Sequence, residues 1–199
     1  MGQGREVVLV CEDALSMAVL RRLVSHARPQ LMVRLPIIPG SNTALFANMP
    51  KYVKASQQGV PHILLTDLDR NECAPGLMGR WDVPSLPGQL LFRVAVHEVE
   101  SWILADRRGF AEMTGLPLAK LPVDPDRILD PKQYLLNLVR RCRKNRLKRD
   151  VLPEQGSSAS KGVFYNDRFG EFVGANWNVD NAAKRSPSLS KALLRLGSF

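Results

Sequence analysis

The chain has 199 residues, enough for one domain with an extension, and its 45% hydrophobic residues can bury a core, which excludes wholesale disorder. No apolar run is long enough to span a membrane, and we expect no secretory signal and no lipid anchor, because Glu6 stands where a myristoylation signal needs Ser or Thr. Three widely spaced cysteines indicate a reducing compartment, so we expect a cytoplasmic protein without a disulfide framework.

The net charge of +9 comes from one half of the chain. Residues 1–106 carry ten Lys/Arg and ten Asp/Glu, whereas residues 107–199 carry eighteen and nine. An excess confined to one half predicts a polyanionic partner for that half, with nucleic acid as the first candidate. An anionic protein or membrane surface also fits this charge, and a homo-oligomer is compatible with the sequence.

Apolar and helical patterns alternate through the first 110 residues. Continuous or β-branched apolar runs predict four strands, at residues 6–11, 31–38, 61–67 and 89–96. Helical spacing predicts helices at 12–27, at 41–58 with a break near Pro50, and at 97–110, and the Pro- and Gly-rich segment 70–88 predicts a loop. This alternation predicts an α/β fold with a mostly parallel four-stranded sheet flanked by helices.

The pattern changes after residue 110. A proline-punctuated linker at 116–131 precedes a basic helix at 132–150, a small-residue loop at 154–162 and a terminal helix at 186–196 that starts at Ser186 with Pro187 in its first position. We therefore predict an α/β core over residues 1–110 and a basic, mostly helical extension over 111–199 packed on it.

Two predicted strands end in carboxylates. Glu12 follows the first strand, and Asp67 and Asp69 end the third. The carboxyl ends of parallel strands share one edge of a sheet, and a spacing of two in extended backbone points both aspartates the same way. An all-oxygen cluster of this kind suits Mg²⁺ or Mn²⁺, which would remove the mutual repulsion of the carboxylates. The alternative is structural: Asp67 caps a turn and Asp69 pairs with Arg70 or another base.

The helix predicted at 97–110 contributes further acids. At about 100° per residue, Glu100 falls beside the apolar face of Val99 and Ile103, while Glu98 points outward as a solvated charge. Burial of an unpaired carboxylate is expensive, so Glu100 is a fourth candidate metal ligand. Asp106 is either a residue at the end of the helix or an acid that contacts and orients the metal ligands.

Familiar nucleotide and zinc motifs do not occur. Ser101 stands where a zinc protease has its second histidine, and the chain contains neither GxxxxGK[ST] nor GxGxxG. A nucleotidyl transferase would need a nucleotide site that the sequence does not reveal.

A glutamate after the first strand and a DxD after a later one, here "VLVCED" and "LLTDLDR", resemble the TOPRIM (topoisomerase–primase) fold. The segment "FRVAVHEVESWILAD" (92–106) is similar to that of a small TOPRIM-like family related to OLD-type (overcoming lysogenization defect) nucleases, with Glu100, Trp102 and Asp106 at matching positions. The segment "SASKG" is similar to the place where these proteins carry a lysine, here Lys161.

This resemblance implies a Rossmann-like TOPRIM core and a metal-dependent nuclease that works with an ATPase in defence against phage or mobile DNA. The chain has no ATPase motif, so the ATPase would be a separate subunit. Asp13 replaces the glycine that often follows the TOPRIM glutamate, where it would crowd the loop or support the ligands.

The expected reaction is hydrolysis of a phosphodiester bond of DNA or RNA, with one or two Mg²⁺ or Mn²⁺ ions held by Glu12, Asp67, Asp69 and Glu100. Lys161 would approach a phosphate oxygen or the leaving group, although an ordinary loop lysine also fits its position. Expected phosphate contacts are among the seven cations of the basic helix: Arg140, Arg141, Arg143, Lys144, Arg146, Lys148 and Arg149. These cations surround most of the helix and cannot all face one duplex, and a solvated helix is the alternative. Trp177, Phe164 and Tyr165 are candidates for base stacking or for the core. The competing interpretation is a non-catalytic TOPRIM-like module that binds nucleic acid or docks on an ATPase.

Overall fold

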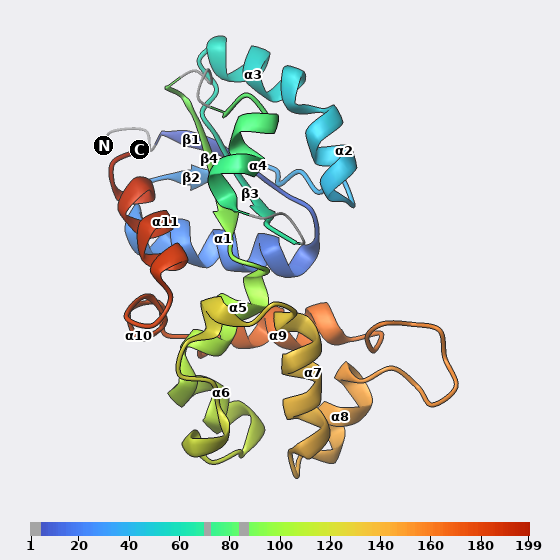
Figure 1. The fold of residues 1–199 in the computed structure, drawn as a ribbon. Helices are drawn as coiled ribbons and strands as arrows, with labels where there is room; N and C mark the ends of the chain where they lie inside the picture. The colour runs from blue at the N-terminus through green and yellow to red at the C-terminus, as the bar shows by residue number, and fades with distance from the viewer. Residues whose placement is uncertain (1–4, 70–72, 84–87) are drawn as a thin grey trace.

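The computed structural model describes residues 5–69, 73–83 and 88–199. Four parallel strands form one sheet in the order β2-β1-β3-β4: β1 (Glu6–Cys11), β2 (Met32–Val33), β3 (His62–Asp67) and β4 (Leu90–Ala95) (Figure 1). The predicted α/β class with a parallel four-stranded sheet flanked by helices is confirmed. Strands β1 and β3 are direct neighbours, so their carboxyl ends lie side by side at one edge.

The second strand is much shorter than the predicted 31–38. Only Met32 and Val33 pair with β1, and a single bridge joins Val10 to Ile37 further on. Pro36 lies between the two contacts and has no N–H to donate to a ladder, which explains the interruption.

One face of the sheet is covered by three short helices: α2 (Asn42–Ala47), α3 (Met49–Gln57) and α4 (Ala74–Arg80). The break predicted near Pro50 is confirmed, since Asn48 separates the end of α2 from the start of α3. The prediction of a loop across 70–88 is wrong for α4, which begins after Cys73 and buries Leu77 against the sheet. Residues 70–72 and 84–87 of that prediction lie outside the described residues.

The opposite face is covered by α1 (Ala14–Ala27) and by the last helix, α11 (Pro187–Gly197). The predicted start of α11 is confirmed, because Ser186 caps it and its Oγ accepts a hydrogen bond from the backbone N–H of Leu189 at 3.1 Å. Within the described ranges, no helix is long and apolar enough to cross a membrane.

The helix predicted at 97–110 is two helices, α5 (Val99–Ala105) and α6 (Arg107–Thr114). Asp106 separates them and caps α6, as its Oδ1 accepts from the N–H of Gly109 at 3.3 Å. Its Oδ2 accepts from the N–H of Asn178 at 2.8 Å, which ties the break to a distant part of the chain.

The helix predicted at 132–150 is also divided, into α7 (Pro131–Arg141) and α8 (Asn145–Val151), because Cys142 adopts an extended conformation. The linker before it contains two 3₁₀ turns, Leu118–Lys120 and Pro125–Arg127, and the loop at 154–162 has neither helix nor strand. Helices α9 (Tyr165–Ala175) and α10 (Val179–Ala183) were not predicted.

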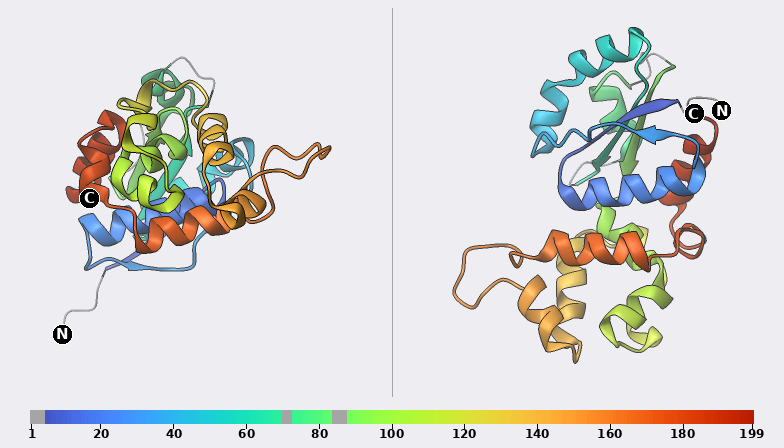
Figure 2. Two further views of the ribbon diagram at one scale, coloured as in Figure 1. Left: turned by 90° about the horizontal axis from the view of Figure 1, so that it is seen from below. Right: turned by 180° about the vertical axis from the view of Figure 1, so that it is seen from behind.

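Helices α5 to α9 gather below the sheet and its flanking helices (Figure 1). Viewed from behind, α9 runs alongside α1, and α11 returns to lie beside the sheet (Figure 2). Segments from the predicted extension therefore pack directly on α1 and β4 of the predicted core, and one buried apolar cluster spans both.

Candidate functional site

Glu12 lies one residue beyond the end of β1, at the border with β3. Its Oε1 accepts hydrogen bonds from Thr66 Oγ1, from the N–H of Asp67 at 3.0 Å and from Asn42 Nδ2 at 3.4 Å. Burial raises the pKa of Glu12 above its usual value, and the charge of Asp69 raises it further, although these donors lower it. The donors orient one carboxylate oxygen, Oε1.

Asp67 ends β3 next to Glu12, and its Oδ1 accepts from the N–H of Val99 at 3.0 Å. Burial raises the pKa of Asp67 well above its usual value, and the charges of Glu100, Glu12 and Asp69 raise it further. Asp67 therefore stands among carboxylates from the ends of two strands and from α5.

Asp69 is near the same group, but its backbone is not extended as predicted. It has φ 51°, in the left-handed region that Asp tolerates better than most residues. Its N–H donates to the carbonyl of His97 at 3.0 Å, which anchors the turn to the segment that enters α5. The alternative pairing with Arg70 lies outside the described residues.

Glu100 is buried, as its helical position predicted, with 2% of its surface exposed. Its Oε1 accepts from the hydroxyl of Tyr165 at 2.8 Å and lies 3.8 Å from Lys132 Nζ, while its Oε2 is buried without a hydrogen-bond partner. Burial raises the pKa of Glu100, and Lys132 counteracts this in part.

Glu98 is not the solvated charge that helical geometry predicted. It is the N-cap residue of α5 rather than a helical residue, so the angle assigned to it does not apply. Its side chain is 16% exposed; Oε2 accepts from the N–H of Lys132 at 2.8 Å and Oε1 lies 3.6 Å from Lys132 Nζ. Glu98 therefore joins α5 to the start of α7.

Sequence reasoning did not assign Thr66 and Asn42 to the site, and it also missed two contributors from further along the chain, Lys132 and Tyr165. Although burial lowers the pKa of Lys132, the charges of Glu100 and Glu98 raise it above its usual value, so the lysine is a permanent cation here. Burial, followed by the charge of Glu100, raises the pKa of Tyr165, which keeps its hydroxyl a donor. Neither residue has a spacing or motif that relates it to the acids.

Lys161 lies at the margin of this group. Its Nζ donates to Asn166 Oδ1 at 2.8 Å, lies 3.9 Å from Asp13 Oδ2 and sits 4.9 Å from the centroid of the Tyr165 ring. Asp13 also caps α1, because its Oδ1 accepts from the N–H of Ser16 at 2.8 Å. These contacts place the lysine on the Tyr165 side of the carboxylates.

The side chains of Asp106 and Trp102 make hydrogen bonds that hold the fold together, and none of these bonds reaches the carboxylates of the site. Both carboxylate oxygens of Asp106 accept from backbone N–H groups, those of Gly109 and Asn178, which corresponds to the helix-end interpretation. Trp102 is fully buried, and its indole N–H donates to Ser188 Oγ at 2.6 Å.

The donor set fits a hard divalent cation in its chemistry, since all ligand atoms are carboxylate oxygens and Glu100 leaves one buried oxygen without a partner. The arrangement is not a closed coordination site: across the residues that the structure describes, no group of three His, Cys, Asp or Glu side chains is positioned to hold a metal ion. Occupation by Mg²⁺ or Mn²⁺ would require Glu12, Asp67, Asp69 and Glu100 to adjust their side chains.

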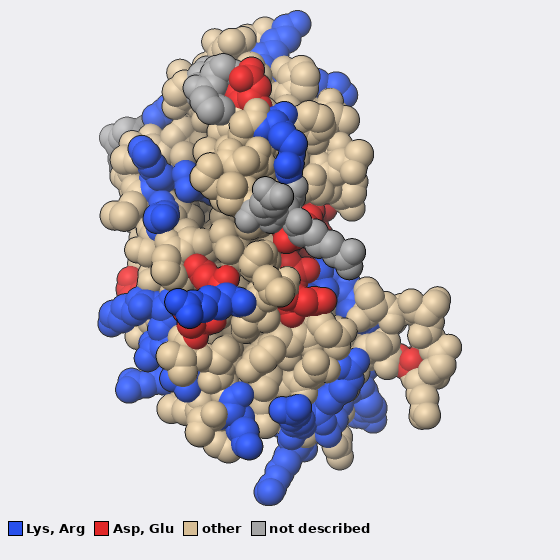
Figure 3. Space-filling model, in the orientation of Figure 1, with Lys and Arg blue, Asp and Glu red and all other residues tan. Residues whose placement is uncertain are grey.

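The basic residues of α7 and α8 form a surface on the same side. Figure 3 shows acidic side chains in the middle of this face and Lys and Arg side chains gathered below them, over α7 and α8. Of the seven predicted phosphate contacts, all except the partly buried Lys148 are exposed. The stacking candidates Trp177 and Tyr165 are fully buried in the core, whereas Phe164 is 54% exposed.

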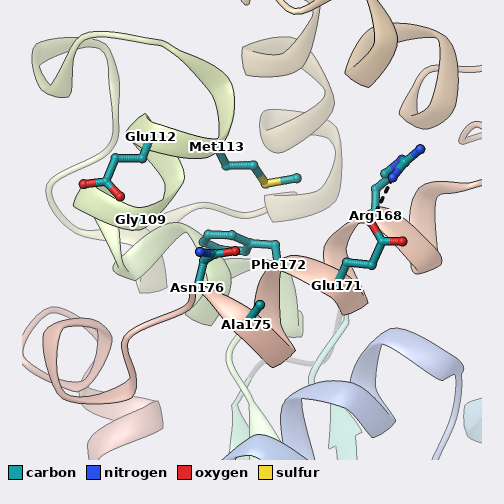
Figure 4. A pocket seen from close by; sticks show the side chains of 8 residues that line it. All are labelled: Gly109, Glu112, Met113, Arg168, Glu171, Phe172, Ala175 and Asn176. Atoms are coloured by element: carbon teal, nitrogen blue, oxygen red, sulfur yellow. Dashed lines mark hydrogen bonds and ion pairs between the residues drawn. The ribbon is translucent and has the colours of Figure 1, made fainter.

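A separate pocket of about 370 Å³ lies between α6 and α9 (Figure 4). Phe172 and Met113 contribute apolar surface, and Glu112 and Glu171 contribute charge. Arg168 at its rim is already engaged, with Nη1 2.9 Å from Glu171 and Nε 2.6 Å from Asp150. Glu12, Asp67, Asp69 and Glu100 do not line this pocket.

In comparisons with known proteins, no family model, curated protein or solved structure matches the chain, so the functional argument rests on these residues.

Proposed function

We propose that this protein is a TOPRIM-like, Mg²⁺- or Mn²⁺-dependent nuclease that hydrolyses phosphodiester bonds of DNA or RNA. The observation that carries the proposal is the convergence of Glu12, Asp67 and Glu100 from β1, β3 and α5, with pKa values raised by burial and, for Asp67, by the charges of the other two. Lys132 neutralises Glu100 in part, whereas neither Glu12 nor Asp67 has a basic side chain within 4 Å among the described residues, and a bound cation would supply the missing positive charge.

The chain's own residues would have distinct roles. Glu12, Asp67, Asp69 and Glu100 would hold the cation, and the hydrogen bonds from Thr66, Asn42 and Tyr165 orient two of these carboxylates. When bound, the cation would supply charge neutralisation at the phosphate and a lowered pKa of water.

Lys161 would complete the charge balance. From its place beside Asp13 and Tyr165 it would neutralise a nonbridging phosphate oxygen or the leaving oxygen. In the reaction, water adds to phosphorus, the P–O bond to the leaving oxygen breaks, and the proton from water passes to that oxygen through solvent.

The exposed cations of α7 and α8 would bind the phosphates of the substrate strand. By the same family resemblance, we propose that a separate ATPase subunit accompanies the nuclease and that the pair acts in the cytoplasm against phage or mobile DNA.

The test is cleavage of single- and double-stranded DNA and RNA in Mg²⁺ and in Mn²⁺. We expect Asp67→Ala to abolish cleavage, and the matched control Asp180→Ala, an acid 69% exposed on α10, to retain it. If the unmodified protein leaves every substrate intact in both metals, the proposal is wrong.

A second candidate is the non-catalytic nucleic-acid-binding module, and one observation favours it: the described residues hold no ready-made metal group of three ligands. Nucleic-acid binding that falls steeply with salt, is indifferent to Asp67→Ala and is never followed by cleavage would support this candidate.

A further inference from the structure

A basic groove lies at the far end of α7 from the carboxylates. It measures about 680 Å³ and is formed between the segment after α6 and the C-terminal end of α7. Lys120, Arg141 and Arg143 provide its charge, and Leu116, Pro117 and Leu138 provide apolar surface. It thus combines cations with apolar walls in one concave site.

The charge of this groove is not neutralised within the described chain. Lys120, Arg141 and Arg143 are exposed, and none of them forms an ion pair with an acid of the described residues. Beside them, Lys144 Nζ donates to the backbone carbonyl of Glu112 at 2.8 Å, which ties the start of α8 to α6. Cations gathered without acids attract a polyanion.

Helix α7 connects this groove to the carboxylates and sets the distance between them. Its second residue, Lys132, contacts Glu98 and Glu100, and its last residue, Arg141, lines the groove. Nine residues at 1.5 Å per residue separate the two by about 14 Å along the helix. Since a stacked strand advances about 3.4 Å per nucleotide, that span corresponds to roughly four nucleotides.

We propose that the groove of Lys120, Arg141 and Arg143 binds phosphates of a nucleic-acid strand about four nucleotides from the phosphodiester held at the carboxylates. Phosphate binding in the groove is independent of the proposed nuclease function; only the distance to a phosphodiester at the carboxylates rests on it. Because the two contacts lie about four nucleotides apart, the substrate would be a polynucleotide rather than a mononucleotide, a dinucleotide or a phosphomonoester.

The first experiment measures binding without divalent cations, so that cleavage plays no part. Fluorescent single- and double-stranded DNA and RNA are titrated in EDTA with the wild type and with Lys120→Gln/Arg141→Gln/Arg143→Gln. The matched control, Lys184→Gln/Arg185→Gln/Lys191→Gln, removes the same charge from exposed positions around α10 and α11.

We expect the groove variant to bind at least about tenfold more weakly and to lose about two to three units from the slope of log affinity against log salt. The control should bind within about twofold of the wild type at equal salt, because the groove rather than the overall charge is the contact. Equal losses in the groove variant and the control would overturn the inference, as would tighter binding of anionic lipid vesicles than of nucleic acid.

The second experiment measures cleavage of substrates in which one to eight nucleotides flank the scissile bond on either side. We expect a sharp rise in rate once one flank reaches about four nucleotides, and no such rise for the groove variant. A rate independent of flank length would refute the distance. If no substrate is cleaved but the groove variant still loses binding, the nuclease proposal fails and the groove remains a binding site; if cleavage occurs and the groove variant binds normally, the groove inference alone fails.

Discussion

Replacement of Lys132 by methionine removes the only positive charge that the described structure places within 4 Å of Glu98 and Glu100. The Nζ to Oε1 distances are 3.6 and 3.8 Å, so each attraction is roughly 4 kcal/mol at an effective dielectric constant of 20 before the cost of desolvation. Removal of one partner from a buried ion pair costs about 3–5 kcal/mol. Since the Lys132 side chain is 29% exposed and thus partly screened, we expect the lower end, about 3 kcal/mol near pH 7.5.

The loss should depend on pH in a defined direction. Lys132 lowers the raised pKa of Glu100, so without the lysine that pKa rises further. The folded variant then binds a proton that the unfolded chain releases, and stability falls as pH rises between the unfolded and folded pKa values. The deficit against the wild type should therefore be largest near pH 8 and shrink toward pH 5, a range over which the lysine itself stays charged.

The assay is urea unfolding followed by circular dichroism at pH 5, 6.5 and 8. Lys132→Arg serves as the control that keeps the charge, and Lys132→Met/Glu100→Gln should recover most of the loss at pH 8 because the second change removes the unpaired carboxylate. A deficit below about 0.5 kcal/mol at pH 8, or one of equal size at pH 5 and pH 8, would refute the assigned role of the lysine.

Two further measurements address the carboxylates, and a third addresses the close backbone packing at Gly162. Because the pKa of Asp67 is raised in the folded protein, the folded protein binds more protons than the unfolded chain, and the melting temperature in EDTA should fall from pH 5 to pH 8. Addition of Mn²⁺ should restore the melting temperature at pH 8. No response to Mn²⁺ would count against a cation site. Tyr165→Phe removes the 2.8 Å hydrogen bond to buried Glu100 and should cost about 1.5–3 kcal/mol in urea unfolding, whereas an unchanged midpoint would contradict that bond. Gly162→Ala should destabilise the protein by about 1–3 kcal/mol, because the added Cβ would lie 2.6 Å from a backbone oxygen. Gly174→Ala in α9, where the added Cβ meets nothing within 4 Å, should stabilise it by about 0.5–1 kcal/mol. Equal effects of the two substitutions would contradict the close packing around Gly162.

Much of the carboxylate edge was predictable from local pattern. Apolar runs that end in Glu12 and Asp67 identify buried strands, and parallel strands present their carboxyl ends at one edge whatever the details of the loops. Glu100 is buried, as its place beside Val99 and Ile103 predicted, but all seven residues of α5 are buried, so this burial comes from the packing of the whole helix and not from its helical phase alone.

Other features depend on where a segment stops being regular, which local pattern does not define. Helical periodicity puts Glu98 on the outward side of the predicted helix, but the residue lies at the N-cap, so its side chain turns to α7 instead of solvent. Asp106 and Cys142 interrupt what look like continuous helices, because capping hydrogen bonds and an extended residue override helical periodicity at those points.

The sequence by itself determined the α/β class, the carboxylates at the strand ends and the concentration of positive charge in the second half of the chain. Only the tertiary structure decided that Lys132 and Tyr165, which are 32 and 65 residues from Glu100, become its partners. The reason is physical: α7 and α9 pack against α5 and α1 through apolar side chains that have no relation to the acids, and this packing alone brings the lysine and the tyrosine to them.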